Sequence, residues 1–107
     1  MSRKSNQFSA QSVDEKAQEA TDFLKALAHD QRLSIVCLLL KGEMTVTEIQ
    51  HALGTRQAAT SQQITRLRLS GLVSGRREGK EVYYSVSDEK VHAVIATLQK
   101  SFCRDDE

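Results

Sequence analysis

The sequence lacks an apolar segment long enough to cross a bilayer, and its N-terminus shows no signal-peptide pattern. Its longest apolar run, residues 35–40, is far shorter than the roughly 20 residues that a transmembrane helix needs. The opening segment, residues 1–12, is mostly polar. We therefore expect a soluble, cytoplasmic protein with no membrane contact.

The chain also lacks the residue patterns that enzymes use. It has no Ser/His/Asp set, no glycine-rich phosphate loop and no plausible pair of catalytic carboxylates. We therefore expect a binding protein without a cofactor rather than an enzyme.

Cysteine and histidine are too sparse to predict a metal site. The two cysteines, Cys37 and Cys103, are far apart in the sequence and form no CxxC motif. His51 is the one histidine of its predicted helix, and His92 has no acidic or histidine partner four residues later. We expect no bound metal and no disulfide-stapled scaffold, so any pairing of the two thiols would be regulatory.

Positive charge is concentrated in one segment, although the net charge of the whole chain is only +1. Residues 54–80 contain six cations and one anion, a net charge of +5, so the rest of the chain carries −4. The six cations are Arg56, Arg66, Arg68, Arg76, Arg77 and Lys80. A basic surface on a slightly acidic body is typical of proteins that bind phosphate backbones, although a solvated charged surface has the same composition.

A chain of 107 residues with 39% hydrophobic content suits one domain with a modest core. Apolar residues recur every three or four positions over 13–27, which predicts an amphipathic helix. Its apolar seam either covers the core of its own chain or packs on a partner. The segment 33–40 is apolar on all sides except at Ser34, which is typical of a central, buried helix, and it contains Cys37.

Two further helices follow, joined by a tight turn. Thr45 and Glu48 have the spacing of a capping box at the start of the first, and Gly54 ends it. The second helix spans 57–69. Two short helices around a turn at 54–56 predict a helix-turn-helix.

The apolar period then changes from that of a helix to that of a strand. Alternation along 82–86, after a turn at 78–80, predicts a β-hairpin with a cationic tip. Asp88 caps a last helix that has one apolar face. That face consists of Val91, Val94, Ile95, Leu98 and Phe102.

This order of elements and four segments of the chain resemble the ArsR/SmtB family of winged helix-turn-helix repressors. The segments are LKALAHDQRLSIVCLLLKG, TEIQHALG, ATSQQITRLRLSGLV and GRREGKEVYYSV, and the resemblance covers roughly 23–86 and the last helix. It implies a mainly α fold with a β-hairpin wing, α-α-α-α-β-β-α, in a homodimer formed by the first and last helices. It also implies a bacterial transcription repressor that binds double-stranded operator DNA with half-sites about 10 bp apart.

Three positions depart from the family pattern. Asp30 replaces the usual proline at a helix start. Arg56 stands where a capping serine is common, which leaves Thr55 as the expected cap. Thr60 replaces an aliphatic residue and so changes the packing of the second helix of the motif.

The helix at 57–69 has a polar face opposite its apolar anchors, Ile64 and Leu67. We expect Gln62 to contact base edges, because its amide can pair bidentately with adenine. Ser61 and Arg66 are the candidates for phosphate contacts, which fix position without reading sequence.

In the hairpin, Arg76 and Arg77 face opposite ways, so we expect only one of them to contact DNA. We take Arg77 as the candidate, together with Lys80 at the tip. The predicted DNA-binding residues are Arg56, Gln57, Ser61, Gln62, Thr65, Arg66, Arg77 and Lys80.

One cysteine in the second helix and one in the last resemble the dithiol branch of this family, the sulfide- and persulfide-responsive repressors. The resemblance implies that Cys37 and Cys103 meet within a protomer and are linked by reactive sulfur species through a disulfide or a polysulfide, which lowers operator affinity. Cys103 lies about 100° off the apolar stripe of the last helix, so we expect it to be accessible.

Two alternatives keep the same fold. One is a repressor that responds to peroxide or general oxidants through a simple disulfide, and the other is a constitutive DNA-binding regulator with inert thiols. A protein–protein adaptor would leave the charge of segment 54–80 unexplained.

We expect a disordered tail at 1–11, a winged domain with dimerisation helices at both ends at 12–104, and a C-terminal tail at 105–107.

Overall fold

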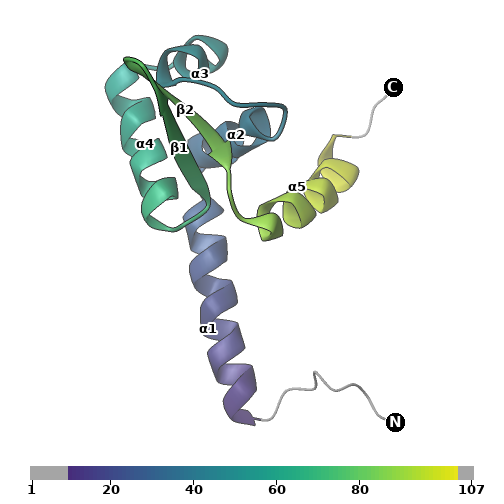
Figure 1. The fold of residues 1–107 in the computed structure, drawn as a ribbon. Helices are drawn as coiled ribbons and strands as arrows, with labels where there is room; N and C mark the ends of the chain where they lie inside the picture. Colours follow the sequence, from purple (N-terminus) through teal and green to yellow (C-terminus); the bar gives the residue numbers. More distant parts are fainter. Residues whose placement is uncertain (1–9, 104–107) are drawn as a thin grey trace.

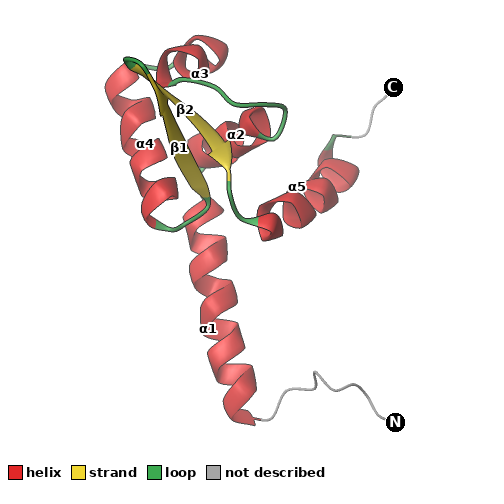
Figure 2. Cartoon of the chain, in the orientation of Figure 1, coloured by secondary structure: helices red, strands yellow, loops and turns green. Residues whose placement is uncertain are grey.

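The computed structural model describes residues 10–103, which form five helices and one two-stranded sheet. The helices are α1 (Ala10–Leu27), α2 (Asp30–Leu39), α3 (Val46–Leu53), α4 (Gln57–Leu69) and α5 (Glu89–Phe102). Strands β1 (Val73–Glu78) and β2 (Glu81–Val86) lie between α4 and α5 in the chain (Figures 1 and 2). The predicted order of elements and the mainly α fold with a hairpin wing are confirmed.

The first helix begins at Ala10, three residues before the predicted start, and projects from the rest of the domain (Figure 1). Residues 10 and 11 of the expected N-terminal tail are therefore helical, whereas 1–9 and the C-terminal tail at 105–107 lie outside the described residues. Although α1 has 18 residues, no described helix is apolar enough to span a bilayer.

The hydrophobic core forms around α2, as its apolar sequence predicts. Ile35, Val36 and Leu39 are buried, and they pack with side chains from the other helices and from the start of the hairpin. The remaining members of the core are Leu27, Ile49, Ile64, Leu67, Leu72, Val73, Val91 and Ile95. Each such side chain contributes about 1.5–3 kcal/mol on full burial, so the core fixes α4 and the base of the hairpin.

The ends of α3 and α5 are capped as the sequence predicts. The Thr45 hydroxyl accepts from the Glu48 N–H at 3.1 Å, and a Glu48 carboxylate oxygen accepts from the Thr45 N–H at 2.9 Å. Gly54 ends α3 with φ 67°, a left-handed conformation that favours glycine, and so turns the chain toward α4. Asp88 caps α5 through the Lys90 N–H at 2.8 Å. These caps confirm the helix-turn-helix and the last helix.

A further backbone segment pairs with the two-stranded hairpin, which the sequence pattern did not predict. β1 and β2 are antiparallel in a register that places Gly75 opposite Tyr84 and Arg76 opposite Tyr83. On the edge of β2 that faces away from β1, Tyr84 exchanges two backbone hydrogen bonds with Met44, at 2.8 and 3.1 Å. The segment between α2 and α3 is thereby held beside the wing.

Candidate functional site

Helix α4 is held by its apolar face and leaves its polar face to solvent. Ile64 and Leu67 are fully buried, as predicted. The opposite face exposes Gln62 and Thr65, Gln57 is exposed as the first residue of the helix, and Ser61 is half-buried. The structure therefore brings these four predicted DNA-binding residues together on one helix.

The start of α4 is stabilised differently from the prediction. Thr60 is buried, and its hydroxyl donates to the Arg56 carbonyl at 3.0 Å. Because its one proton is used there, the Thr55 hydroxyl must donate to the Thr60 oxygen, 2.6 Å away. Thr55 thus does not cap α4, because its side chain bonds Thr60 instead. No described side chain accepts from the first turn of the helix, which leaves its N–H groups beside the exposed Arg56 open to an anion.

The two neighbouring arginines of the wing have different surroundings. Arg76 donates to both oxygens of Glu43, at 2.8 and 3.1 Å, and to Glu78 at 2.6 Å. Its guanidinium carbon also lies 5.1 Å from the centre of the Tyr83 ring. The hydrogen bond from Arg76 holds the pKa of the Glu43 carboxyl below its usual range. The charge of Arg76 is thus compensated within the protein.

Arg77 and Lys80, in contrast, are exposed, and neither makes an ion pair within residues 10–103. Lys80 stands in the two-residue turn between β1 and β2. The alternation of the strand separates Arg76 from Arg77, as predicted, but the contact with Glu43 could not be inferred from local spacing. The wing therefore offers two uncompensated charges at its end.

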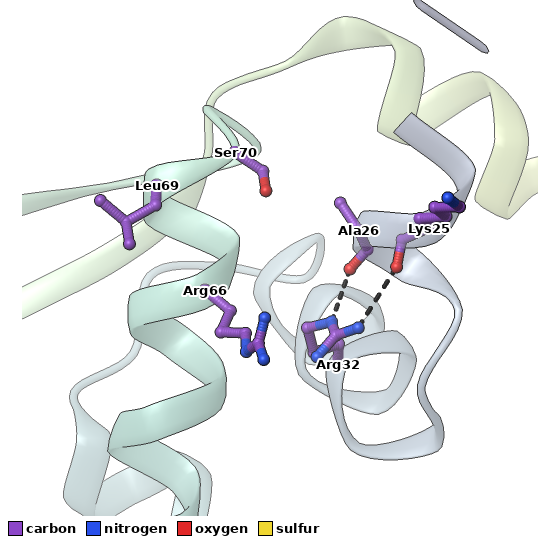
Figure 3. Close-up of a pocket in the computed structure, with 6 residues that line it drawn as sticks. All are labelled: Lys25, Ala26, Arg32, Arg66, Leu69 and Ser70. Carbon is purple, nitrogen blue, oxygen red and sulfur yellow. Dashed lines mark hydrogen bonds between the residues drawn. The ribbon is translucent and has the colours of Figure 1, made fainter. Parts of the chain in front are cut away.

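Arg66 is exposed in the last turns of α4, and its guanidinium turns toward Arg32 of α2 (Figure 3). Arg32 itself connects α2 to α4, because it donates to the Gln63 side chain at 2.8 Å. Both arginines line a cavity of about 260 Å³ at this end of the helix.

The two cysteines are free thiols that line the same cavities. Cys37 on α2 is half-buried, and Cys103 at the end of α5 is exposed. One shared cavity, of about 310 Å³, has mostly apolar walls. Those walls are formed by Leu33, Ile95, Leu98, Gln99 and Phe102 together with the two cysteines.

A second shared cavity, of about 470 Å³, adds the exposed Lys41 to the surroundings of both thiols. Burial raises the pKa of the Cys37 thiol, the nearby Cys103 raises it further, and the positive charge of Lys41 acts in the opposite direction. Burial therefore disfavours the Cys37 thiolate, whereas the charge of Lys41 favours it.

The terminal helices leave apolar surface uncovered. Val13 and Leu24 of α1 are 43% and 54% exposed, and Phe102, predicted to share the apolar face of α5, is 78% exposed. A groove of about 420 Å³ between α1 and α5 is lined by Phe23, Leu24 and neighbouring residues. The apolar seam of α1 thus covers the core of its own chain only at the C-terminal end of the helix.

Comparisons with known proteins agree with this architecture. Residues 29–74 match the family described as bacterial regulatory protein, arsR family. The chain is 38% identical to the biofilm growth-associated repressor of Agrobacterium fabrum over 89% of its own length and 81% of that protein. It is 37% identical to the transcriptional activator HlyU of Vibrio cholerae, over 88% of this chain and 87% of that protein.

Two solved structures extend the comparison. Reduced HlyU from Vibrio cholerae superposes with a TM-score of 0.83, covering 88% of this chain and 99% of that one. The homodimeric winged helix-turn-helix DNA-binding domain of Mb0332 from Mycobacterium bovis is 32% identical, with a TM-score of 0.74 over 94% of this chain and 89% of that one. The predicted resemblance is thus confirmed at the level of the whole fold.

Proposed function

Because this chain belongs to the ArsR family of bacterial regulators, which are DNA-binding transcription factors and not enzymes, we propose that it is a repressor with a thiol switch. In this proposal reactive sulfur species link Cys37 to Cys103, and the linkage lowers the affinity of the protein for operator DNA. The observation that carries it is that thiols from two different helices, α2 and α5, line the same cavity.

The different exposure of the two thiols supports an order of reaction. Cys103 is exposed, so its thiolate meets a hydropersulfide, R–S–SH, first and attacks the outer sulfur. This step forms a persulfide on Cys103 and releases the thiol R–SH, which takes up the proton that Cys103 lost.

Cys37 completes the reaction. Its thiolate attacks the inner sulfur of the Cys103 persulfide, forms the disulfide and releases H₂S, which carries the proton from Cys37. The two protein thiols are oxidised, and the hydropersulfide is reduced to R–SH and H₂S. With a trisulfide donor, R–S–S–S–R, a three-sulfur bridge forms instead and two molecules of R–SH leave.

The packing of α2 offers a physical route from the bridge to the DNA-binding surface. Cys37 stands in the same helix as the buried Val36 and as Arg32, which hydrogen-bonds Gln63 of α4. A covalent link between α2 and α5 would therefore act on the helix that hydrogen-bonds α4 and on the helix that lines the groove along α1. A bias of ~3 kcal/mol toward a state that binds DNA poorly reduces affinity roughly a hundredfold.

We further propose that the protein acts as a homodimer through α1 and α5. The exposed Val13 and Leu24 and the groove between these helices support this interface, as does the homodimeric relative Mb0332. A twofold-symmetric dimer would place two copies of α4 on DNA half-sites about 10 bp apart.

On the DNA we assign separate roles to α4 and the wing. Gln62 contacts base edges, while Ser61, Arg66, Arg77 and Lys80 contact phosphates. Arg56 and Gln57 contribute to the anion-binding start of α4, and Thr65 lies beside Gln62 on the exposed face. The free charges of Arg77 and Lys80, against the compensated Arg76, support this assignment.

Intact-protein mass spectrometry tests the thiol reaction. The reduced protein is treated separately with a persulfide and with peroxide, beside Cys37→Ser and Cys103→Ser. We expect the persulfide to give an intramolecular bridge in the wild type and no such bridge in either variant. A bridge formed by peroxide alone would instead favour the general-oxidant alternative, and unchanged masses in both treatments would favour inert thiols.

The direction of regulation is tested by transcription from a promoter that carries the operator. One relative is named a repressor and another an activator, so both outcomes occur among similar proteins. We expect the reduced protein to lower transcript levels, and an increase would contradict the assignment as a repressor.

A further inference from the structure

A cavity of about 260 Å³ lies where the end of α1, the start of α2 and the end of α4 meet (Figure 3). Two guanidinium groups and one hydroxyl belong to its lining, and no carboxylate does. Its residues are Lys25, Ala26, Arg32, Arg66, Leu69 and Ser70.

Arg32 is fixed in this cavity by three hydrogen bonds. Its Nε donates to the Ala26 carbonyl at 2.6 Å, Nη2 to the Lys25 carbonyl at 3.2 Å and Nη1 to Gln63 at 2.8 Å. A guanidinium has five N–H groups, so two are still available to a ligand. The group is pre-organised, and binding would cost little of its side-chain entropy.

Arg66 turns its guanidinium toward Arg32, as Figure 3 shows, and the Ser70 oxygen also points toward the space between them. Lys25 also lines the cavity, but its carbonyl oxygen faces Arg32 and its ammonium points away (Figure 3). None of these three cations makes an ion pair within the part of the chain that the structure describes. Like charges held close together are unfavourable unless an anion lies between them.

We propose that this cavity binds an oxyanion of the phosphate class between Arg66 and the free N–H groups of Arg32, with Ser70 as an additional donor. Planar guanidinium forks suit the oxygens of such a group. The phosphate is that of a DNA backbone or of a free small molecule. The backbone is favoured because Arg66 stands one turn after Gln62 on α4, and because Leu69, beside the cavity, is 81% exposed and offers an apolar surface to a sugar.

This anion site is more than a single phosphate contact of Arg66, because it also includes Arg32 of α2 and Ser70 at the end of α4. It does not depend on the thiol reaction. It is tested on the full-length, reduced protein with inorganic phosphate as the probe. Phosphate is titrated against chloride at constant ionic strength while the Nε–Hε signals of the arginines are followed by NMR. We expect saturable shifts at Arg32 and Arg66, lost in Arg66→Gln and retained in the matched Arg68→Gln, whose side chain does not line the cavity.

Operator binding over a range of salt concentrations separates the two sources. If the phosphate belongs to DNA, Arg66→Gln lowers the slope of log K against log salt by about 0.9, and saturating phosphate weakens operator binding. An unchanged slope together with saturable phosphate shifts assigns the cavity to a free phosphate compound. An unchanged slope with no difference between phosphate and chloride overturns the proposal.

Discussion

The DNA-binding half of the molecule, formed by α2, α3, α4 and the hairpin, and the terminal half, formed by α1 and α5, differ in how they use apolar side chains. In the first, Ile64 and Leu67 are buried and a polar face is left outside. In the second, Val13, Leu24 and Phe102 are 43–78% exposed. The anchors of the first half are thus covered within one chain, whereas the second half leaves apolar side chains on its surface, where we propose that a partner binds.

The largest expected effect comes from placing a charge on the exposed surface of α1. Leu24→Glu should convert the dimer to a monomer, because the carboxylate would have to lose its hydration at the interface. A monomer holds one half-site, so operator affinity should fall on the order of a thousandfold, toward non-specific binding. Analytical ultracentrifugation and an operator titration measure both effects.

The matched control is Leu69→Glu, which changes an even more exposed leucine outside α1 and should leave the dimer intact. A Leu24→Glu protein that still sedimented as a dimer would contradict the assignment of the interface to α1.

A smaller effect is expected within the DNA-binding half, on sequence preference. Gln62→Ala should lose about 1–3 kcal/mol of discrimination at one base pair in each half-site, because the bidentate amide contact disappears. Binding to a set of operators with single base changes measures this loss. If Gln62→Ala instead weakened all duplexes equally, the side chain would not contact a base edge.

The wing gives a comparison between adjacent residues. Arg77→Ala should weaken binding to every duplex and lower the salt slope by about 0.9, as expected for one lost phosphate contact. Lys80→Ala should behave in the same way. Arg76→Ala should leave the slope nearly unchanged, because Glu43 and Glu78 already compensate that charge. Equal slopes for Arg76→Ala and Arg77→Ala would contradict the distinction between them.

The smallest effect concerns the reactivity of Cys37. Burial raises its pKa and Lys41 opposes that shift, so removing the cation should raise the pKa further. In a Cys103→Ser background, Lys41→Gln should therefore move the pH profile of Cys37 alkylation toward higher pH and slow alkylation at neutral pH. Lys80→Gln, at the wing, should leave the profile in place, and a profile unaffected by Lys41→Gln would argue against its influence on Cys37.

The features that local spacing determines were predicted from the sequence. The capping box of Thr45 and Glu48 depends on residues three positions apart, and the anchors Ile64 and Leu67 follow from helical periodicity. The boundaries of α4 and the opposite orientation of the two wing arginines follow in the same way.

Contacts between distant segments could not be predicted in this way. The bonds of Arg76 with Glu43 and of Arg32 with Gln63 join residues 33 and 31 positions apart. The exposure of Phe102 shows the limit of periodicity, which identifies a face but not what covers it. That Cys37 and Cys103 line shared cavities was expected only from the family resemblance, because no local pattern relates them.

The most direct test of the account is an operator titration by fluorescence anisotropy on one preparation in three states: reduced, bridged by persulfide and verified by mass, and reduced again. We expect affinity to fall roughly a hundredfold on bridging and to recover on reduction, with no change for Cys103→Ser under the same treatment. Equal operator affinity of the reduced and the verified bridged protein would contradict the proposed switch.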